Sequence, residues 1–187
     1  MLAYAFWHWK RPEISTETYE ARQGDFQAAL AAHPPEGFVR GSTVRIEGAP
    51  WAAGGEQAYE DWYIIHGMSS LEALNEAAVT AARRAPHDAV AQLALGGTAG
   101  LYGLRAGTPM TAPSLATWFS KPTGLSYTAL LEALAPIIAT TPATLWMRQM
   151  VLGPTPEFCL HSRLPVELPP GVTGHTLSLV PVWNGPA

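Results

Sequence analysis

Two histidines stand near the predicted ends of strands. His8 lies inside the aromatic stretch "AFWHWKRP", and His66 ends the stretch "EDWYIIHG". Histidine changes charge near neutral pH, so it can act as a general acid or base and can also bind a metal. Lys10 and Arg11 add positive charge close to His8. This is the pattern in the sequence that most favours chemistry.

The two histidines become a site only if the fold brings them together. In the sheet described below, we expect the first and third strands to be central neighbours that run parallel, so that His8 and His66 share one edge. Each is followed by a predicted helix N-terminus, where backbone N–H groups favour an anion. We therefore predict an aromatic-lined pocket with His8 and His66 as catalytic groups. The residues predicted to bind the ligand are Trp9, Lys10, Trp62 and Tyr63.

A structural interpretation stands beside this one. A single histidine on an apolar strand is more often a hydrogen-bonded structural residue, and strand register cannot be deduced from the sequence. Two histidines are also too few for a metal, because a typical site uses three or four ligands. Asp61 is a conceivable third ligand, but strand parity puts it on the opposite face from His66. We predict no metal site.

Three weaker patterns have simpler explanations. Cys159 and His161 share a strand face, which suggests nucleophilic chemistry only if the thiol is activated. The adjacent His87 and Asp88 are expected to point apart at a helix start. The glycine-rich "GGTAGLYG" lacks the Lys-Ser/Thr of a phosphate loop and precedes a strand. Its glycines are expected to permit a tight turn or close packing.

Composition excludes several classes of protein. The 187 residues carry a formal charge of −4 with scattered cations, which argues against a nucleic-acid binder. Cys159 is the single cysteine, so no intramolecular disulfide is possible and the cytoplasm is the expected location. The stretch 89–104 is shorter than the roughly 20 apolar residues that span a bilayer. We expect a soluble protein with no targeting segment, no membrane partner and no nucleic-acid partner.

The first half of the chain predicts the elements that position these residues. Residues 2–10 alternate as a strand, with Tyr4, Phe6 and His8 on one face, and both faces are apolar, as in a central strand. A helix follows from Ser15 or Thr16 to about residue 33. Strands at 37–48 and 58–67, a helix opened by the capping box 69–72 and broken at Pro86, and a strand at 99–107 complete a β-α-β-β-α-β order.

The second half begins in the same way. It predicts a strand at 115–121, a helix capped by Ser126, and strands near 144–152, 157–163 and 175–183. The connection "LPVELPPGVTG" has too many prolines and glycines for a helix, so this half is β-α-β-β-β. Trp118 and Lys121 repeat the spacing of Trp7 and Lys10. We predict two ferredoxin-like repeats, 1–110 and 111–187, that share one core in an α+β fold.

The stretches "AFWHWKRP", "EDWYIIHGMSSLEALNEAAV" and "GGTAGLYGLRAG", with the echo "ATWFSKP", give the chain a pattern that resembles the dimeric α/β-barrel superfamily. The resemblance implies two antiparallel sheets that close face to face as a barrel. Members include cofactor-free monooxygenases, haem-dependent enzymes and lactone isomerases. They share no catalytic residue, so none is transferred to this chain. The second repeat departs from the pattern because it lacks a helix.

Three functions remain open. The first is a small-molecule enzyme, monooxygenase-like or isomerase-like, that acts on an apolar or aromatic ligand in the barrel. The second is a non-catalytic protein that binds such a ligand. The third is a structural protein that self-associates through its uncovered sheet, for example as a homodimer. The cofactor is unknown: the resemblance makes haem possible, but no motif requires it. We put the enzyme first because histidines and cations at strand ends exceed what packing needs.

Overall fold

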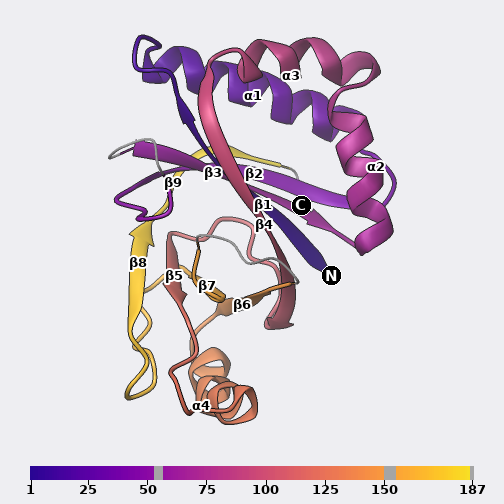
Figure 1. The fold of residues 1–187 in the computed structure, drawn as a ribbon. Helices are drawn as coiled ribbons and strands as arrows, with labels where there is room; N and C mark the ends of the chain where they lie inside the picture. The colour runs from indigo at the N-terminus through magenta and orange to yellow at the C-terminus, as the bar shows by residue number, and fades with distance from the viewer. Residues whose placement is uncertain (53–56, 150–154, 186–187) are drawn as a thin grey trace. The chain divides into compact units, whose positions relative to one another are not determined.

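The computed structural model describes residues 1–52, 57–149 and 155–185. The chain divides into two compact units, one formed by Met1–Ala99 with Val180–Ala187 and the other by Gly100–Leu179. Figure 1 shows that both combine helices with antiparallel strands, so the chain is α+β as predicted. The two repeats expected at 1–110 and 111–187 stay a prediction, and the contacts group Val180–Ala187 with the first unit.

The first unit contains the predicted β-α-β-β-α-β elements. In chain order these are β1 (Leu2–Lys10), α1 (Thr16–Ala32), β2 (Phe38–Glu47), β3 (Gln57–Ile65), α2 (Met68–Ala78), α3 (Arg84–Ala91) and the start of β4 (Ala94–Ala106), followed by β9 (Val180–Asn184) from the chain end. The strand order is β4-β1-β3-β2-β9. Strand β1 is therefore central, as its two apolar faces predicted. Figure 1 shows α1, α2 and α3 on one side of this sheet.

The expected parallel pairing of the first and third strands is wrong. Strand β1 runs antiparallel to β3, with Leu2 opposite Ile65 and His8 opposite Tyr59. The reason lies in the connections. The helix α1 carries the chain back, so that β2 starts in the same direction as β1. The next strand, β3, turns back and is therefore antiparallel to both β1 and β2.

This register decides which residues share the helix-covered face of the sheet. Residues directly opposite each other in neighbouring strands point to the same side. Phe6 of β1 lies opposite Asp61 of β3, and Asp61 lies opposite Thr43 of β2. His8 is on the same face as Phe6, two residues further along the strand. Polar side chains from three strands therefore meet beneath the helices.

The helix α1 is positioned by its cap and its buried face. Ser15 accepts a hydrogen bond from the Thr18 backbone N–H, as the sequence predicted. The buried residues fall three and four apart, which places them on one side of the helix. They are Tyr19, Gln23, Phe26, Gln27 and Leu30. Two glutamines in this row bring polar groups to a buried surface.

The predicted capping box of the second helix is wrong. The helix α2 begins at Met68 after Gly67, which caps it without a side chain, and the Ser70 N–H donates to the Gly67 carbonyl. Its end is also earlier than expected, at Ala78. Pro86 then lies in the first turn of α3, where a missing N–H costs no helical hydrogen bond.

Two glycines at the start of β4 allow close approach to β1. A Cβ at Gly97 would come within 2.6 Å of the Phe6 ring, and one at Gly96 within 3.0 Å of the Trp9 ring. The expectation that the glycines of this segment permit close packing is confirmed at these positions.

The second unit contains the predicted β-α-β-β-β elements. They are β5 (Leu115–Phe119), α4 (Tyr127–Thr140), β6 (Ala143–Arg148), β7 (Phe158–Ser162) and β8 (Gly174–Ser178), in the strand order β8-β5-β7-β6 and then the end of β4. Ser126 caps α4 by accepting from the Ala129 N–H, as predicted. Residues 163–173 contain no helix. That the two units are repeats of each other stays a prediction, as does closure of a barrel.

Three predicted strands have different bounds. The strand expected near 175–183 is two strands, of which β8 pairs with β5 and β9 pairs with β2. The strand expected at 99–107 already begins at Ala94. The strand expected at 144–152 ends at Arg148, and residues 150–152 lie outside the described residues. Within the described ranges, no helix is both long and apolar enough to cross a membrane.

Candidate functional site

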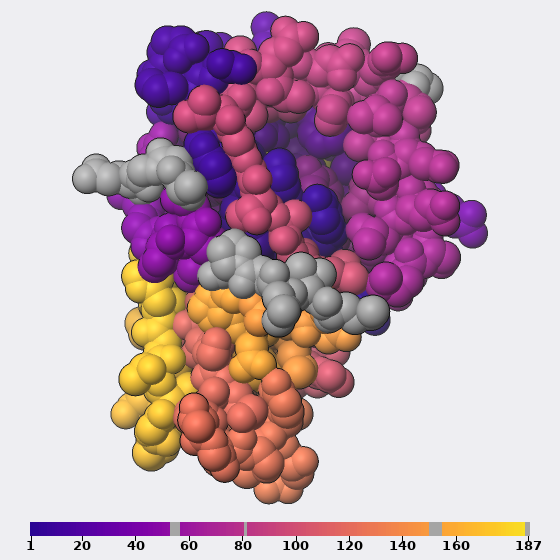
Figure 2. Space-filling model, in the orientation of Figure 1, coloured from indigo at the N-terminus to yellow at the C-terminus, as the bar shows by residue number. Residues whose placement is uncertain are grey.

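A cavity of about 660 Å³ lies in the first unit between the sheet and the three helices. Figure 2 shows the surface hollowed between α2 and β4, with atoms of the N-terminal strand visible inside. A volume of this size falls within the usual range for small-molecule sites. One end of the cavity is polar and is formed by His8, Tyr19, Gln23, Asp61 and Tyr63. The rest is mostly apolar.

The apolar part comes from β1 and the helices. Its walls include Tyr4, Phe6, Phe26, Leu30, Leu71, Leu74, Ala78 and Val90. Met68, Glu72 and Asn75 of α2 also line the cavity and are exposed, so they form its rim. A pocket with one polar end and ring-rich walls suits an aromatic ligand whose polar group enters first.

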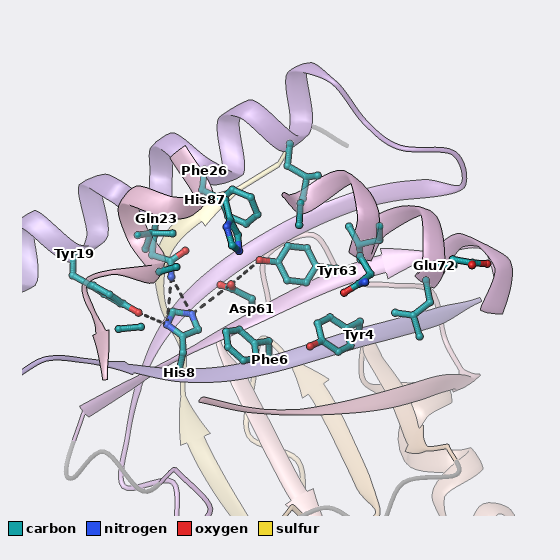
Figure 3. Close-up of a pocket in the computed structure, with 18 of the residues that line it drawn as sticks. Tyr4, Phe6, His8, Tyr19, Gln23, Phe26, Asp61, Tyr63, Glu72 and His87 are labelled. Carbon is teal, nitrogen blue, oxygen red and sulfur yellow. Dashed lines mark hydrogen bonds and ion pairs between the residues drawn. The ribbon is translucent and has the colours of Figure 1, made fainter. Parts of the chain in front are cut away.

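His8 is almost fully enclosed in the cavity wall, with a side chain only 1% exposed. Its ring stacks on Tyr59, with centroids 5.5 Å apart, and on Phe6, at 5.2 Å. Its Nδ1 lies 2.7 Å from the Tyr19 hydroxyl, and its Nε2 lies 3.4 Å from Asp61 Oδ2 (Figure 3). The two stacked rings and two polar partners hold the imidazole in one orientation.

Asp61 holds the other end of this chain of contacts. Its Oδ1 accepts a hydrogen bond of 2.6 Å from Thr43, and its Oδ2 accepts one of 2.7 Å from Tyr63. Gln27 supports both donors, since its Nε2 donates to the Thr43 and Tyr63 oxygens at 2.9 and 3.1 Å. The buried carboxylate is therefore fixed by hydroxyl donors before His8 is counted.

These contacts define the tautomer of His8. An ionised carboxylate only accepts hydrogen bonds, so the hydrogen of a neutral His8 ring lies on Nε2, toward Asp61. Nδ1 then accepts from the Tyr19 hydroxyl. Burial raises the pKa of Tyr19 and, together with the Asp61 charge, raises the pKa of Tyr63 well above the usual range. Both phenols therefore remain protonated and act as donors.

Gln23 lies over the His8 ring. Its Nε2 is 3.3 Å from Nδ1 and 3.2 Å from Nε2 of the imidazole. Its Oε1 is buried and has no hydrogen-bond partner among the described residues. In Figure 3 the amide of Gln23 lies at the cavity side of α1, above His8. An amide oxygen left in this position is an acceptor available to a ligand.

The structure does not bring His8 and His66 together. His66 is exposed and follows the end of β3 that lies beside Leu2, whereas His8 pairs with Tyr59 at the other end of the same strand. The paired site depended on parallel strands, so that juxtaposition is wrong. A role for His66 alone stays a prediction.

The predicted ligand-binding residues divide between the two faces of the sheet. Tyr63 lines the cavity. Trp62 points to the opposite face, where its indole N–H donates to Glu60, as does that of Trp7 at 2.6 Å. Trp9 lies against the Gly96 position, and Lys10 ends β1; neither lines the described cavity.

Sequence reasoning missed most of the polar partners of His8. The sequence patterns relate Asp61 only to His66, and they do not mark Tyr19, Gln23 or Thr43 as site residues. Antiparallel pairing of β1 and β3 would have put Asp61 on the face of His8. The glutamine at the fourth position after Tyr19 on the buried side of α1 was the signal for the helix contribution.

Of two other candidates, the His87–Asp88 pair differs from expectation and Cys159 does not. His87 and Asp88 do contact each other, with Nδ1 3.1 Å from Oδ1, and His87 lines the cavity edge-on to Phe26. Cys159 is buried in the second unit. In the described parts of the chain, no group of three or more His, Cys, Asp and Glu side chains could hold a metal ion.

The polar end of the cavity offers haem no axial ligand, although His87 lines the cavity elsewhere. Haem iron needs an axial ligand with a free donor atom, and haem propionates favour cations. Both ring nitrogens of His8 are engaged by Tyr19 and Asp61. Among the described residues that line the cavity there is no lysine or arginine.

Comparison with known proteins gives the fold class. No family model and no curated protein matches the chain. A "putative monooxygenase" from Fusobacterium nucleatum matches with a TM-score of 0.65 and 9% identity, covering 98% of this chain and 93% of that chain. A "putative monooxygenase" from Lactobacillus acidophilus matches with 0.60 and 8%, covering 98% and 95%. A "putative chlorite dismutase" matches with 0.50 and 9%, covering 97% and 95%. The chain shares an α+β, ferredoxin-like fold with these structures. Identities this low show the fold alone.

Proposed function

We propose that the chain is a small-molecule enzyme whose active site is the cavity of the first unit, and that it removes a proton from an apolar, aromatic ligand. The observation that carries the proposal is the buried row Tyr19–His8–Asp61 at the polar end of that cavity. A histidine oriented by a carboxylate is a common general base.

The proton path follows from the contacts. The acidic proton of the ligand passes to the Tyr19 oxygen, and the proton of Tyr19 passes to Nδ1 of His8 across their 2.7 Å hydrogen bond. Tyr19 gains one proton and loses one, so it is again a neutral phenol at the end of the step. Asp61 then faces an imidazolium, whose charge it stabilises at low local dielectric. The ligand is left as an anion whose negative charge spreads over its rings.

Two reactions of that anion are chemically balanced. In an isomerisation the proton returns to another carbon, and nothing is oxidised. In a monooxygenation O₂ is the oxidant: one oxygen atom enters the ring as a carbonyl, and the other leaves as water with the ring hydrogen and the hydroxyl proton. The ligand supplies all the electrons. The fold shared with proteins named as monooxygenases makes oxygenation the first reaction to test.

The test uses hydroxylated naphthalenes as probe ligands. In air, an oxygen electrode measures protein-dependent O₂ uptake. Without O₂, mass spectrometry measures deuterium exchange from D₂O into the ring carbon next to the hydroxyl, which reports reversible proton transfer. The proposal predicts exchange above the buffer rate, and O₂ uptake if the enzyme is a monooxygenase. Binding without exchange or uptake contradicts it.

A non-catalytic binding protein is the second candidate. The observation that favours it is that both ring nitrogens of His8 already have protein partners, which suits a fixed wall as well as a base. Binding of the naphthols with neither exchange nor uptake is the result that this candidate predicts. Self-association and a homodimer stay predictions, tested by light scattering.

A further inference from the structure

We infer that the ligand of this cavity is uncharged when it enters and carries a hydrogen-bond donor that meets Gln23 Oε1, and that the cavity rejects ligands that enter as anions. The inference rests on the proposed function in one respect, that the cavity of the first unit is the ligand site. It adds the charge and the polar group of the ligand, and it assigns Gln23 and Glu72 as residues that determine specificity.

The first argument is the unused acceptor of Gln23. Its side chain is 4% exposed, lines the cavity and leaves Oε1 without a partner among the described residues. A buried polar atom without a hydrogen bond is costly, and a ligand donor removes that cost. The neighbouring groups cannot supply the donor, because Tyr19 donates to His8 and Tyr63 donates to Asp61.

The second argument is the charge of the lining. Asp61 at the base and Glu72 at the rim are both acidic, and the described lining contains no lysine or arginine. Thr43, Tyr63 and His8 already contact the Asp61 carboxylate, so none of these groups is left to bind a ligand anion. A carboxylate or phosphate that entered would lose its hydration without meeting a cation, which is strongly unfavourable.

The two arguments together exclude simpler ligands. A purely apolar ring fills the walls but leaves Gln23 Oε1 unpaired. An acceptor-only ligand, such as an ether, places an oxygen against an oxygen. An uncharged hydroxyl donates a hydrogen bond to Gln23 Oε1. It lies next to Tyr19, to whose oxygen its proton can pass.

The experiment compares three probes with one ring system: 2-naphthol, 2-methoxynaphthalene and 2-naphthoate. Calorimetric titration of the full chain gives each dissociation constant. We expect 2-naphthol to bind roughly tenfold tighter than its methyl ether, the worth of one buried hydrogen bond. We expect 2-naphthoate to bind at least tenfold more weakly than 2-naphthol.

Variants then test the two residues. Gln23→Leu should bring the affinities of 2-naphthol and the methyl ether within about threefold of each other, and retained binding of the ether shows that the variant is folded. Glu72→Lys should raise the affinity for 2-naphthoate by roughly threefold, as expected for one exposed charge. Glu76→Lys, on the same helix but outside the lining, is the matched control and should leave it unchanged.

The outcomes separate the inference about the ligand's charge and polar group from the proposal that the cavity is the ligand site. Equal binding of naphthol and ether, or tightest binding of the naphthoate, overturns the inference and leaves the cavity as a ligand site. Binding of none of the three probes overturns the proposed function, and the inference with it.

Discussion

Asp61→Asn should destabilise the protein strongly, although it removes only one charge. The carboxylate accepts from Thr43 at 2.6 Å and from Tyr63 at 2.7 Å, and it lies 3.4 Å from His8 Nε2. An asparagine is uncharged and has a single oxygen, so all of these donors lose a charged acceptor and at least one loses its acceptor altogether. Hydrogen bonds to a buried charged group contribute about 1.5–3 kcal/mol each, so we expect a loss of roughly 3 kcal/mol.

Urea unfolding followed by circular dichroism measures this loss. With a typical dependence of about 2 kcal/mol per molar urea, the midpoint should fall by roughly 1.5 M. The matched control is Asp25→Asn, which breaks the exposed ion pair of Asp25 with Arg22 at 2.9 Å. That pair should contribute no more than about 0.5 kcal/mol. Equal midpoints for the two variants would refute the claim that Asp61 anchors the polar end of the cavity.

Three further predictions follow from the first unit. Burial raises the pKa of Glu60 from its usual 4.5 to about 7, so the folded state favours the protonated form of this side chain. The protein therefore loses folding stability as the pH rises between these two values. The free energy of unfolding of the native chain minus that of Glu60→Gln should fall by roughly 3 kcal/mol from pH 4.5 to pH 7.5 in urea titrations; a flat difference contradicts the shift. Gly97→Ala should lower the melting temperature by several degrees and weaken naphthol binding, because its Cβ would come within 2.6 Å of the Phe6 ring. An unchanged melting temperature and an unchanged naphthol affinity, both measured by calorimetry, would show that β4 can shift to accept the added methyl group. Tyr19→Phe should keep naphthol affinity within about threefold but slow deuterium exchange at least tenfold, and an undiminished exchange rate would remove Tyr19 from the proton path.

Much of the fold was predictable because its signals are local. The alternation of Tyr4, Phe6 and His8 gave the correct face of a central strand, and Ser15 and Ser126 cap helices as expected. The prolines and glycines between β7 and β8 correctly excluded a helix. Each of these features depends on residues within one or two turns of each other.

The site was less predictable because it depends on pairing between distant segments. The direction of β3 relative to β1 decides whether Asp61 or His66 lies near His8, and no local pattern encodes it. The return of β9 to β2 likewise depends on contacts with a segment far away in the chain. Gln23 and Gln27 looked like ordinary helix residues, since only the tertiary contacts show that their side of α1 is buried.

The central claim is that His8, and not His66, is the base that removes the proton of the ligand, acting through Tyr19. The direct measurement is the rate of deuterium exchange into 2-naphthol without O₂ for the native chain, His8→Gln and His66→Gln. We expect a loss of at least 100-fold for His8→Gln, with naphthol binding kept as the sign of a folded cavity, and a native rate for His66→Gln. A native rate in His8→Gln, or an equal loss in both variants, would contradict the account.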